Sequence, residues 1–137
     1  MCKHGGMDYR TCLRAAAISG GTGVALGAFG AHGLREILLR TGMSNAWETA
    51  VRYHLVHAVG LLCLSLWIRQ ESPVNERFFR WATNAWILGT LLFSGSLYGL
   101  ALGGPRWLGP ITPFGGVALI LGWMFLLVAA SRSTEHR

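Results

Sequence analysis

The sequence predicts an all-α fold, a four-helix transmembrane bundle that forms one integral membrane domain over residues 1–137. Charged residues make up 13% of the chain, about half of the ~25% typical of a soluble domain. Hydrophobic residues make up 52%, which excludes a disordered chain. No charge interrupts residues 81–102 or 113–130, and a helix needs about 20 mostly apolar residues to cross a bilayer core. Both stretches are therefore predicted to span a membrane.

Two further apolar stretches are shorter and are flanked by arginine. Residues 13–32 begin beside Arg14, and residues 50–68 contain Arg52 and end before Arg69. Each stretch is long enough to span if these arginine side chains extend to the lipid headgroups. The predicted spans are therefore 13–32, 50–68, 81–102 and 113–130.

The first span has an alternative interpretation as a cleaved signal peptide. Basic residues precede it, and Ala28, Phe29 and Gly30 form a small-residue site of the kind that signal peptidases cut. Glycine is frequent between residues 20 and 30, however, whereas signal-peptide cores favour helix formers such as leucine. The membrane span is therefore the preferred interpretation.

The connections between the spans carry two local signals. Residues 34–40 (LREILLR) form a short amphipathic segment, which is predicted to lie on the outer surface in the first outer loop. Thr112 followed by Pro113 is typical of a helix start, because threonine caps helices and proline suits the first helical position. The last helix is therefore predicted to begin there.

Basic residues are distributed unequally across the predicted membrane, eight on the side of the termini and four on the other. Since basic loops remain in the cytoplasm, both termini are predicted to be cytoplasmic. Tryptophan at both interfaces agrees, with Trp67 and Trp81 on the cytoplasmic side and Trp47 and Trp107 on the outer side. The eight are Lys3, Arg10, Arg14, Arg69, Arg77, Arg80, Arg132 and Arg137, and the four are Arg35, Arg40, Arg52 and Arg106.

The net charge of +6 does not indicate a nucleic-acid partner, because the basic residues never cluster into a run. The lipid bilayer, with its anionic headgroups, is the expected partner. The cysteines Cys2, Cys12 and Cys63 show no CxxC spacing. They therefore predict neither a disulfide framework nor a zinc site.

Small residues recur at every fourth position in two of the predicted spans. Such spacing lets helix backbones approach closely, which is the main packing device between helices in lipid. We expect the two faces to pack against each other or against a partner chain. The face in the first span consists of Ala15, Ser19, Gly23, Gly27 and Ala31, and the face in the third span of Gly95, Gly99 and Gly103.

The third span also carries larger residues at the same spacing, namely Trp86, Thr90, Ser94 and Tyr98. Hydroxyl groups in such positions bond across helices or back to their own helix. Packing between helices is the preferred interpretation, and a pocket wall is the alternative.

Several separated motifs together resemble one known family. They are AFGAHGL at 28–34, YHLVH at 53–57, GTLLFSGSLY at 89–98, TPFGG at 112–116 and GW at 122–123. The chain resembles the domain of unknown function 423, a family of small multi-pass membrane proteins that includes the eukaryotic transmembrane protein 256. The resemblance covers about residues 13–130. It implies a four-helix protein of the bacterial inner membrane, and it implies no reaction.

Polar residues near the outer interface are candidates for a ligand site. His54 and His57 lie three residues apart on one predicted helix, His32 closes the first span on the same side, and Tyr98 lies at similar depth. Ionisable residues within spans are functional candidates by default. Imidazole binds haem iron or other metals, and with tyrosine it can hydrogen-bond a quinone. The alternative is a structural role, in which each histidine bonds to a neighbouring helix.

These candidates fall short of a firm cofactor assignment. Two or three histidines without a carboxylate or thiolate partner are too few to predict a metal site. Haem or quinone would suit the cluster, but neither is predicted outright. No catalytic residues and no enzymatic activity are predicted, because serine, cysteine and aspartate form no set of nucleophile and base.

Three functions from different classes fit the sequence. The preferred one is an accessory, assembly or structural membrane subunit, with other membrane proteins or further copies of the chain as partners. The first alternative is a membrane protein that binds quinone, haem or metal through the histidine and tyrosine cluster. The second alternative is an oligomeric pore. Proton-driven transport is disfavoured, since the acidic residues lie outside the span centres.

Overall fold

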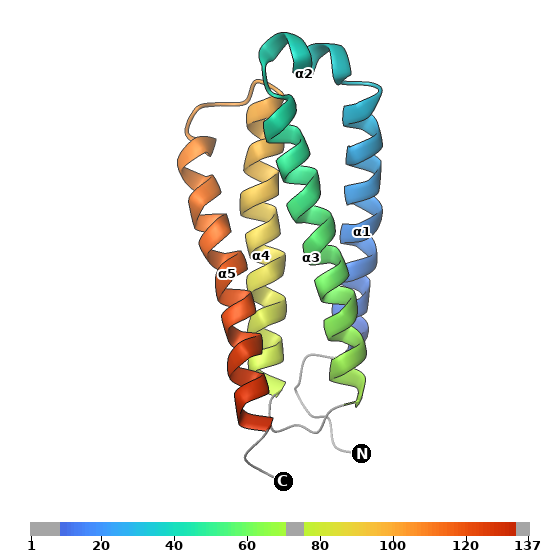
Figure 1. Ribbon diagram of the computed structural model, residues 1–137, viewed down its shortest axis with the longest axis vertical. Coiled ribbons are helices and arrows are strands. Elements are labelled where there is room, and N and C mark those ends of the chain that lie inside the picture. Colours follow the sequence, from blue (N-terminus) through green and yellow to red (C-terminus); the bar gives the residue numbers. More distant parts are fainter. Residues whose placement is uncertain (1–8, 71–75, 134–137) are drawn as a thin grey trace.

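A computed structural model describes residues 9–70 and 76–133 of the chain (Figure 1). Within these ranges the chain is helical and contains no strand, which confirms the predicted all-α class. The short α2 coincides with the amphipathic segment predicted at 34–40. The helices are α1 (Tyr9–Ala31), α2 (Arg35–Thr41), α3 (Ser44–Gln70), α4 (Glu76–Ala101) and α5 (Leu108–Ser133).

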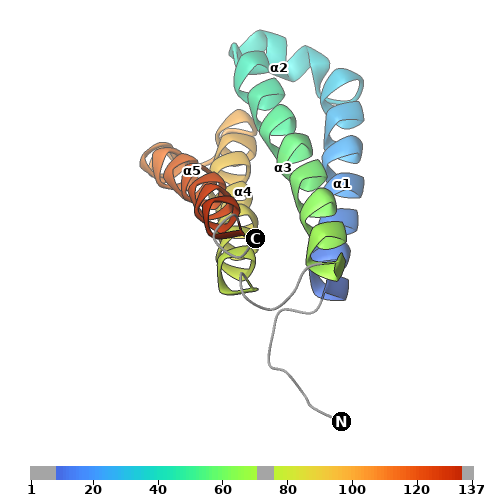
Figure 2. The same cartoon turned by 60° about the horizontal axis from the view of Figure 1, so that its bottom comes forward.

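The four long helices run up and down as two neighbouring hairpins (Figure 1). α1 packs on α3, α3 on α4, and α4 on α5. Within the described residues α1 and α5 do not pack extensively on each other, and Figure 2 shows them on opposite sides of the molecule. The start of α1 and the end of α5 lie at one end, and α2 crosses the other. The helices therefore form an open row.

The prediction of four membrane spans requires a correction. Within the described residues, three helices are long and apolar enough to cross a membrane, namely α1, residues 44–69 of α3 and residues 108–132 of α5. The predicted span 81–102 falls in α4, which is not among them. The physical reason is that polar residues such as Asn84, Thr90 and Ser94 interrupt its apolar sequence. Most of these polar residues are buried between neighbouring helices.

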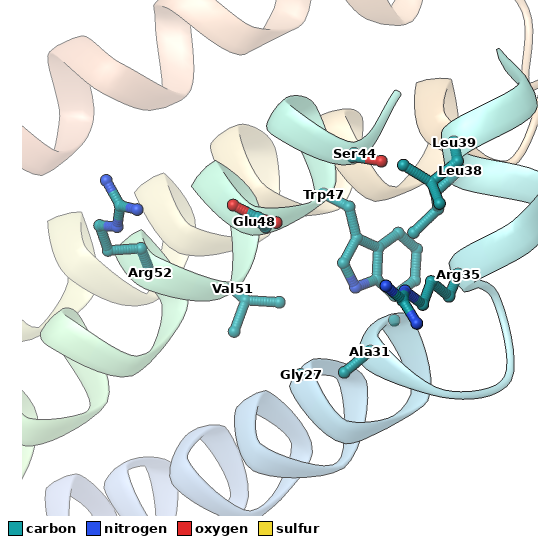
Figure 3. Close-up of a pocket in the computed structure, with 11 residues that line it drawn as sticks. Gly27, Ala31, Arg35, Leu38, Leu39, Ser44, Trp47, Glu48, Val51 and Arg52 are labelled. Carbon is teal, nitrogen blue, oxygen red and sulfur yellow. The ribbon is translucent and has the colours of Figure 1, made fainter. Parts of the chain in front are cut away.

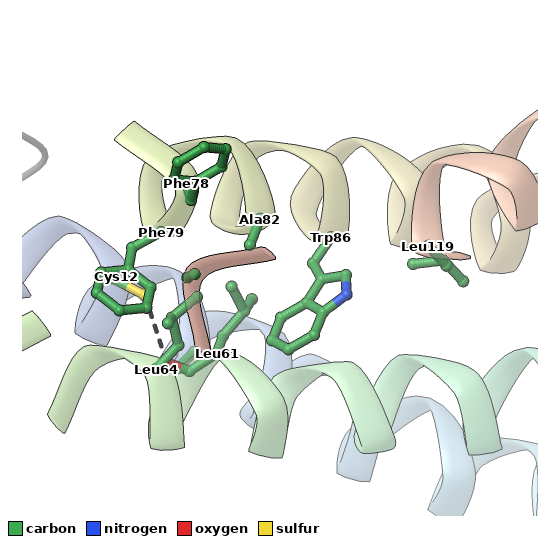
Figure 4. Packing of buried hydrophobic residues seen from close by; sticks show 10 residues of the cluster. Cys12, Leu61, Leu64, Phe78, Phe79, Ala82, Trp86 and Leu119 are labelled. Atoms are coloured by element: carbon green, nitrogen blue, oxygen red, sulfur yellow. Dashed lines mark hydrogen bonds between the residues drawn. The ribbon is translucent and has the colours of Figure 1, made fainter. Parts of the chain in front are cut away.

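One hydrophobic core joins the four long helices, towards the end that carries both termini. Figure 4 shows its side chains. Trp86 is its largest fully buried side chain and is only 1% exposed. Cys12 of α1 joins this core, and its thiol donates a hydrogen bond of 3.3 Å to the carbonyl oxygen of Leu61 on α3. A free thiol buried in this way acts as a small apolar residue. The core consists of Cys12, Ala16, Leu61, Leu64, Phe78, Phe79, Ala82, Trp86, Leu119 and Ala129.

A second core fixes α2 across the other end of the helices. Leu34 and Leu38 pack there against Trp47 of α3 and Ala101 of α4. Trp47 is only 3% exposed, and its indole N–H donates to the carbonyl oxygen of Leu26 at 3.1 Å. The prediction that Trp47 lies at the outer lipid interface is therefore wrong, because the indole closes the junction of α1, α2 and α3. Trp107, by contrast, is exposed.

The small-residue faces of α1 and α4 do not pack directly on each other, which was the first of the two arrangements that we expected. Packing against a partner chain stays a prediction. Gly23 and Gly27 lie against α3, where an added Cβ would come within 2.7 Å of Leu55 Cδ2 and 3.2 Å of Val51 Cγ1 respectively. A Cβ added at Gly95 would have nothing within 4 Å, and one at Gly99 would approach Leu108. Ala15 and Ser19 of the first face and Gly95 of the second face line one cavity between α1, α3 and α4, which separates the two faces.

Other members of the two faces are less enclosed. Ser19 of α1 is half-buried, and Ala31 at the end of the same helix is exposed. Gly103 lies beyond α4 in the turn that leads to α5, with a φ of +82°. That left-handed conformation, which glycine adopts without strain, accounts for Gly103 better than helix packing does.

Close glycine contacts also join α4 to α5, at positions that the fourfold spacing in the sequence did not indicate. A Cβ added at Gly115 would overlap the backbone nitrogen of Phe93 and lie 2.7 Å from its Cα. A Cβ at Gly89 would lie 2.6 Å from Leu119 Cδ2, and one at Gly122 would overlap the indole of Trp86. These three glycines therefore set the distance between the two helices.

The start of α5 also differs from the prediction. The helix begins at Leu108, so Pro113 lies inside it. The predicted cap at Thr112 is wrong, because the preceding residues already form the first turn. Pro110 is tolerated in that turn, since the first four amide groups of a helix have no intrahelical partner. The hydroxyl of Thr112 is instead within 2.7 Å of the hydroxyl of Ser96 on α4.

Candidate functional site

His57 is a structural link between α3 and α5. The side chain is only 4% exposed. Its Nδ1 lies 2.8 Å from the carbonyl oxygen of Tyr53, which can only accept, so Nδ1 carries the proton. Nε2 is then the acceptor for the indole N–H of Trp123 at 3.3 Å. The imidazole also packs edge-on against Trp86. Since both nitrogen atoms have protein partners, a metal or haem iron would have to displace Trp123.

His54 faces a different pair of helices, although it lies only three residues before His57. Its Nδ1 is 3.3 Å from the hydroxyl of Tyr98 on α4, and its Nε2 is 3.4 Å from the hydroxyl of Thr22 on α1. The ring of Tyr98 in turn packs on Trp47, with ring centroids 4.8 Å apart. His54 therefore joins α1, α3 and α4 through two hydroxyl groups.

His32 does not join this cluster. It lies in the turn that follows α1 and is exposed, and its backbone N–H donates to the carbonyl oxygen of Ala28 at 3.1 Å. The structure thus brings together His54 and Tyr98 and places His32 and His57 elsewhere. Within residues 9–70 and 76–133, no three side chains of histidine, cysteine, aspartate or glutamate lie close enough to hold a metal ion.

A cavity of about 400 Å³ opens beside His54, between α1, α3 and α4. Aliphatic side chains form most of its wall, and His54, Tyr98 and Thr22 supply polar groups. Ile18 and Leu91 line it as well and are 69% and 66% exposed, so the cavity is open on the side between α1 and α4. Its lining is Ala15, Ile18, Ser19, Thr22, Leu26, His54, Leu61, Ile87, Thr90, Leu91, Ser94, Gly95 and Tyr98.

Ser94 and Thr90 of α4 line this cavity, and their hydroxyl groups differ in hydrogen bonding. Ser94 is satisfied, because its hydroxyl donates to the carbonyl oxygen of Ala50 at 2.8 Å. Thr90 is only 7% exposed, and its hydroxyl has no hydrogen-bond partner among the described residues. A buried polar atom without a partner costs free energy, so a polar ligand group beside Thr90 would be stabilised.

The sequence identified part of this site. The fourfold spacing of Thr90, Ser94 and Tyr98 indicated one helix face, with a pocket wall as the less favoured interpretation, and the structure places these residues on the cavity wall. Thr22 was missed, since a single hydroxyl in a glycine-rich helix gives no pattern of its own.

Within the described residues, three helices are apolar enough to cross a bilayer, and buried histidine and hydroxyl groups bond between helices. These features define an integral membrane protein. The comparison with known sequences identifies its family. The chain belongs to the family described as "Protein of unknown function (DUF423)", which matches residues 26–116. The resemblance seen in the sequence is thereby confirmed, and the family supplies no reaction.

Relatives across bacteria agree with this assignment. The UPF0382 membrane protein of Staphylococcus epidermidis is 45% identical over 106 residues, 77% of this chain and 83% of the relative. The UPF0382 membrane protein YwdK of Bacillus subtilis is 41% identical over 83% of this chain and 90% of its own. The UPF0382 inner membrane protein YgdD of Escherichia coli is 41% identical over 92% and 93%. No solved structure matches the chain.

Proposed function

We propose that this protein binds an amphiphilic ligand with a hydrogen-bonding ring headgroup, of the quinone class, in the cavity between α1, α3 and α4. The observation that carries the proposal is the position of His54, which bonds to both Tyr98 and Thr22 on the wall of an otherwise apolar cavity. Ligand sites are typically apolar cavities with a few convergent polar groups. The unpartnered hydroxyl of Thr90 supplies a further polar group within the same cavity.

The chemistry of these groups favours a quinone over haem. A quinone oxygen needs only a hydrogen-bond donor, and the hydroxyls of Tyr98 and Thr90 are rotatable donors. The hydroxyl of Thr22 instead donates to the carbonyl oxygen of Ile18 at 2.8 Å, which leaves its oxygen as an acceptor for His54. Haem iron would require a bare imidazole nitrogen, whereas both nitrogen atoms of His54 lie within 3.4 Å of a hydroxyl group. The exposed aliphatic side chains at the cavity mouth suit an alkyl tail that lies among lipids.

The proposal places the chain in the inner membrane as one domain of four spans, with α4 as the fourth. Burial of Thr83, Thr90, Ser94 and Ser96 of α4 supports this, because only lipid-facing positions need to be apolar, although Asn84 is exposed. The described basic residues at the end that carries both termini support cytoplasmic termini. Lys3 and Arg137, which the sequence count includes, lie outside the described residues. These supporting residues are Arg10, Arg14, Arg69, Arg77, Arg80 and Arg132.

The proposed transmembrane position of α4 is tested by cysteine labelling in intact cells. Single cysteines are introduced at Arg77, before the apolar part of α4, and at Trp107, after α4, in a chain whose own cysteines are replaced by serine. A membrane-impermeant thiol reagent is expected to label the cysteine at 107 from outside, and to label the cysteine at 77 only after the cells are opened. Labelling of both sites from the same side would contradict a transmembrane α4.

The ligand proposal is tested with the Tyr98→Phe substitution in the purified full chain. We expect the dissociation constant of an alkylated benzoquinone, measured by quenching of tryptophan fluorescence, to rise about two- to tenfold, since one hydrogen bond contributes roughly 0.5–1.5 kcal/mol. The control is Tyr53→Phe, which removes the same hydroxyl from an exposed tyrosine outside the cavity. Equal binding by both variants, or no quinone binding by the unmodified chain, would contradict the proposal.

An assembly role is a second candidate, favoured by a different observation. Gly21 and Ala25 are exposed four residues apart on α1, and a Cβ added at Gly21 would have nothing within 4 Å. Helix partners in lipid pack on such surfaces, and we propose a second copy of this chain as the partner. The mass of the particle purified in mild detergent for the quinone measurement tests this directly, since a single chain per particle would contradict it. A pore formed by several copies would additionally conduct ions in reconstituted bilayers.

A further inference from the structure

A second cavity, of about 610 Å³, lies where the end of α1, α2 and the start of α3 meet (Figure 3). Its floor is apolar and includes Gly27, Val51 and Trp47. Gly30 is required here, because a Cβ at this position would overlap the indole of Trp47. The cavity is separate from the one beside His54, since the two share no lining residue.

The rim of this cavity is charged. Arg35 of α2 and Glu48 and Arg52 of α3 line it, and all three side chains are exposed. Figure 3 shows Arg35 beside Trp47 and Ala31, with Glu48 and Arg52 further along α3. Within the part of the chain that the structure describes, no ion pair joins either arginine to Glu48. Two cations and one carboxylate leave a net positive rim that suits one anionic group.

A third cavity, of about 400 Å³, continues along the same two helices away from α2. Its lining is entirely made of apolar residues and glycine, and it begins with Val24 of α1 and Leu55 of α3. These residues lie one helical turn from Gly27 and Val51 of the charged cavity. The two cavities therefore follow each other along one side of the α1–α3 pair, and His54 faces the opposite side.

The dimensions of this surface match one lipid molecule. From Gly27 to Leu13, at the far end of the apolar cavity, α1 rises by about 21 Å at 1.5 Å per residue. One leaflet of a bilayer core of ~30 Å is about 15 Å thick, so an acyl chain fits alongside. The charged rim lies at the end of the helices, where the headgroups of that leaflet are expected.

We propose that this side of the α1–α3 pair binds one anionic phospholipid, with its phosphate beside Arg35 and Arg52 and an acyl chain along α1 and α3. Arginine provides several N–H donors in a geometry that matches phosphate oxygens. Glu48 accepts a hydrogen bond from a headgroup hydroxyl, such as that of a glycerol headgroup. The site is independent of the proposed quinone cavity, so either can fail without the other.

The headgroup contact is tested with the purified full chain and three probes, namely dioleoyl phosphatidylglycerol, dioleoyl phosphatidylcholine and inorganic phosphate. We expect phosphatidylglycerol alone to raise the thermal unfolding midpoint and to remain bound through delipidation. In the double variant Arg35→Gln, Arg52→Gln, the affinity for phosphatidylglycerol is expected to fall about ten- to thirtyfold, the loss that follows from removing two basic residues near an anionic headgroup. The control is the double variant Arg40→Gln, Arg106→Gln, which has the same net charge as the first double variant. Neither Arg40 nor Arg106 lines either cavity, so this control should bind phosphatidylglycerol as the unmodified chain does.

The acyl-chain contact is tested separately by filling the apolar cavity. Val59→Trp places an indole in that cavity from a side chain that is already 60% exposed, and Val56→Trp makes the same change at a 51% exposed position outside it. Only Val59→Trp should release the bound phosphatidylglycerol, while both variants keep the helix content of the unmodified chain by circular dichroism. Equal binding of phosphatidylcholine, an equal shift with inorganic phosphate, equal losses in the two arginine pairs, or retention in Val59→Trp would each overturn the proposal.

Discussion

Replacing Gly115 with alanine is expected to force α4 and α5 apart and to lower the free energy of unfolding by about 3 kcal/mol, at the upper end of the usual overpacking range. The new methyl group would overlap the backbone nitrogen of Phe93, and it would lie 2.7 Å from Phe93 Cα and 2.8 Å from the carbonyl carbon of Leu92. All of these are backbone atoms, so no side-chain rotation relieves the contact. Denaturant unfolding in detergent micelles, followed by circular dichroism, measures the loss.

The neighbouring Gly116 supplies a matched control. A Cβ added there would lie 3.7 Å from the ring of Phe93, which is an ordinary van der Waals distance. Gly116→Ala should leave the stability unchanged or raise it slightly, since alanine favours the helix over glycine by up to about 1 kcal/mol. If both alanine variants unfolded at the same denaturant concentration, the close approach of α4 and α5 at Gly115 would be disproved.

Trp86→Ala is the second substitution with a large expected effect, again about 3 kcal/mol of unfolding free energy. Trp86 fills the space between α3, α4 and α5, against Gly60 and Gly122 and against the rings of His57 and Trp123. Truncating a buried tryptophan costs about 3–5 kcal/mol in soluble proteins. The lower end applies here, because transfer from water contributes little between helices in lipid and the loss is mainly one of van der Waals packing. Its indole N–H has no partner among the described residues, so no hydrogen bond is lost.

Trp107→Ala is the control for this prediction. Trp107 is 63% exposed in the connection before α5, so its removal opens no interior cavity. In thermal unfolding measured in the same detergent, the unfolding midpoint of Trp86→Ala should lie well below that of Trp107→Ala. A smaller loss at Trp86 than at Trp107 would contradict the packing that the structure shows.

The sequence was sufficient to predict the helices but not which faces pair. Uncharged runs and arginine at their ends predicted four long helices, because the thickness of a bilayer sets both features. The hydropathy of α4 does not qualify it as a span, since Thr90 and Ser94 are buried by neighbours that a sequence does not reveal. Gly23 and Gly115 look alike in the sequence, yet Gly23 packs on α3 and Gly115 packs on α4. Helix pairing depends on tertiary geometry, which a periodic pattern does not specify.

The same limit applies to the candidate site. The i,i+3 spacing of His54 and His57 predicted a shared face, but the two residues are about 60° apart around the helix, and α3 has neighbours on both sides. His54 therefore meets Tyr98, whereas His57 meets Trp123. The predicted depth in the membrane correctly placed Tyr98 near His54. It misplaced His32, because the chain turns directly after α1 and leaves His32 exposed.

The open row of helices determines how a molecule reaches the cavity beside His54. Because Ile18 and Leu91 at its mouth are exposed, we expect the proposed ligand to enter laterally, from the hydrocarbon phase. Occupancy of the cavity then depends on the mole fraction of ligand among the lipids. Adding empty vesicles at a fixed total amount of ligand lowers this mole fraction. For an amphiphile that partitions almost completely into membranes, occupancy should follow the ligand-to-lipid ratio and hardly change when the aqueous volume is doubled.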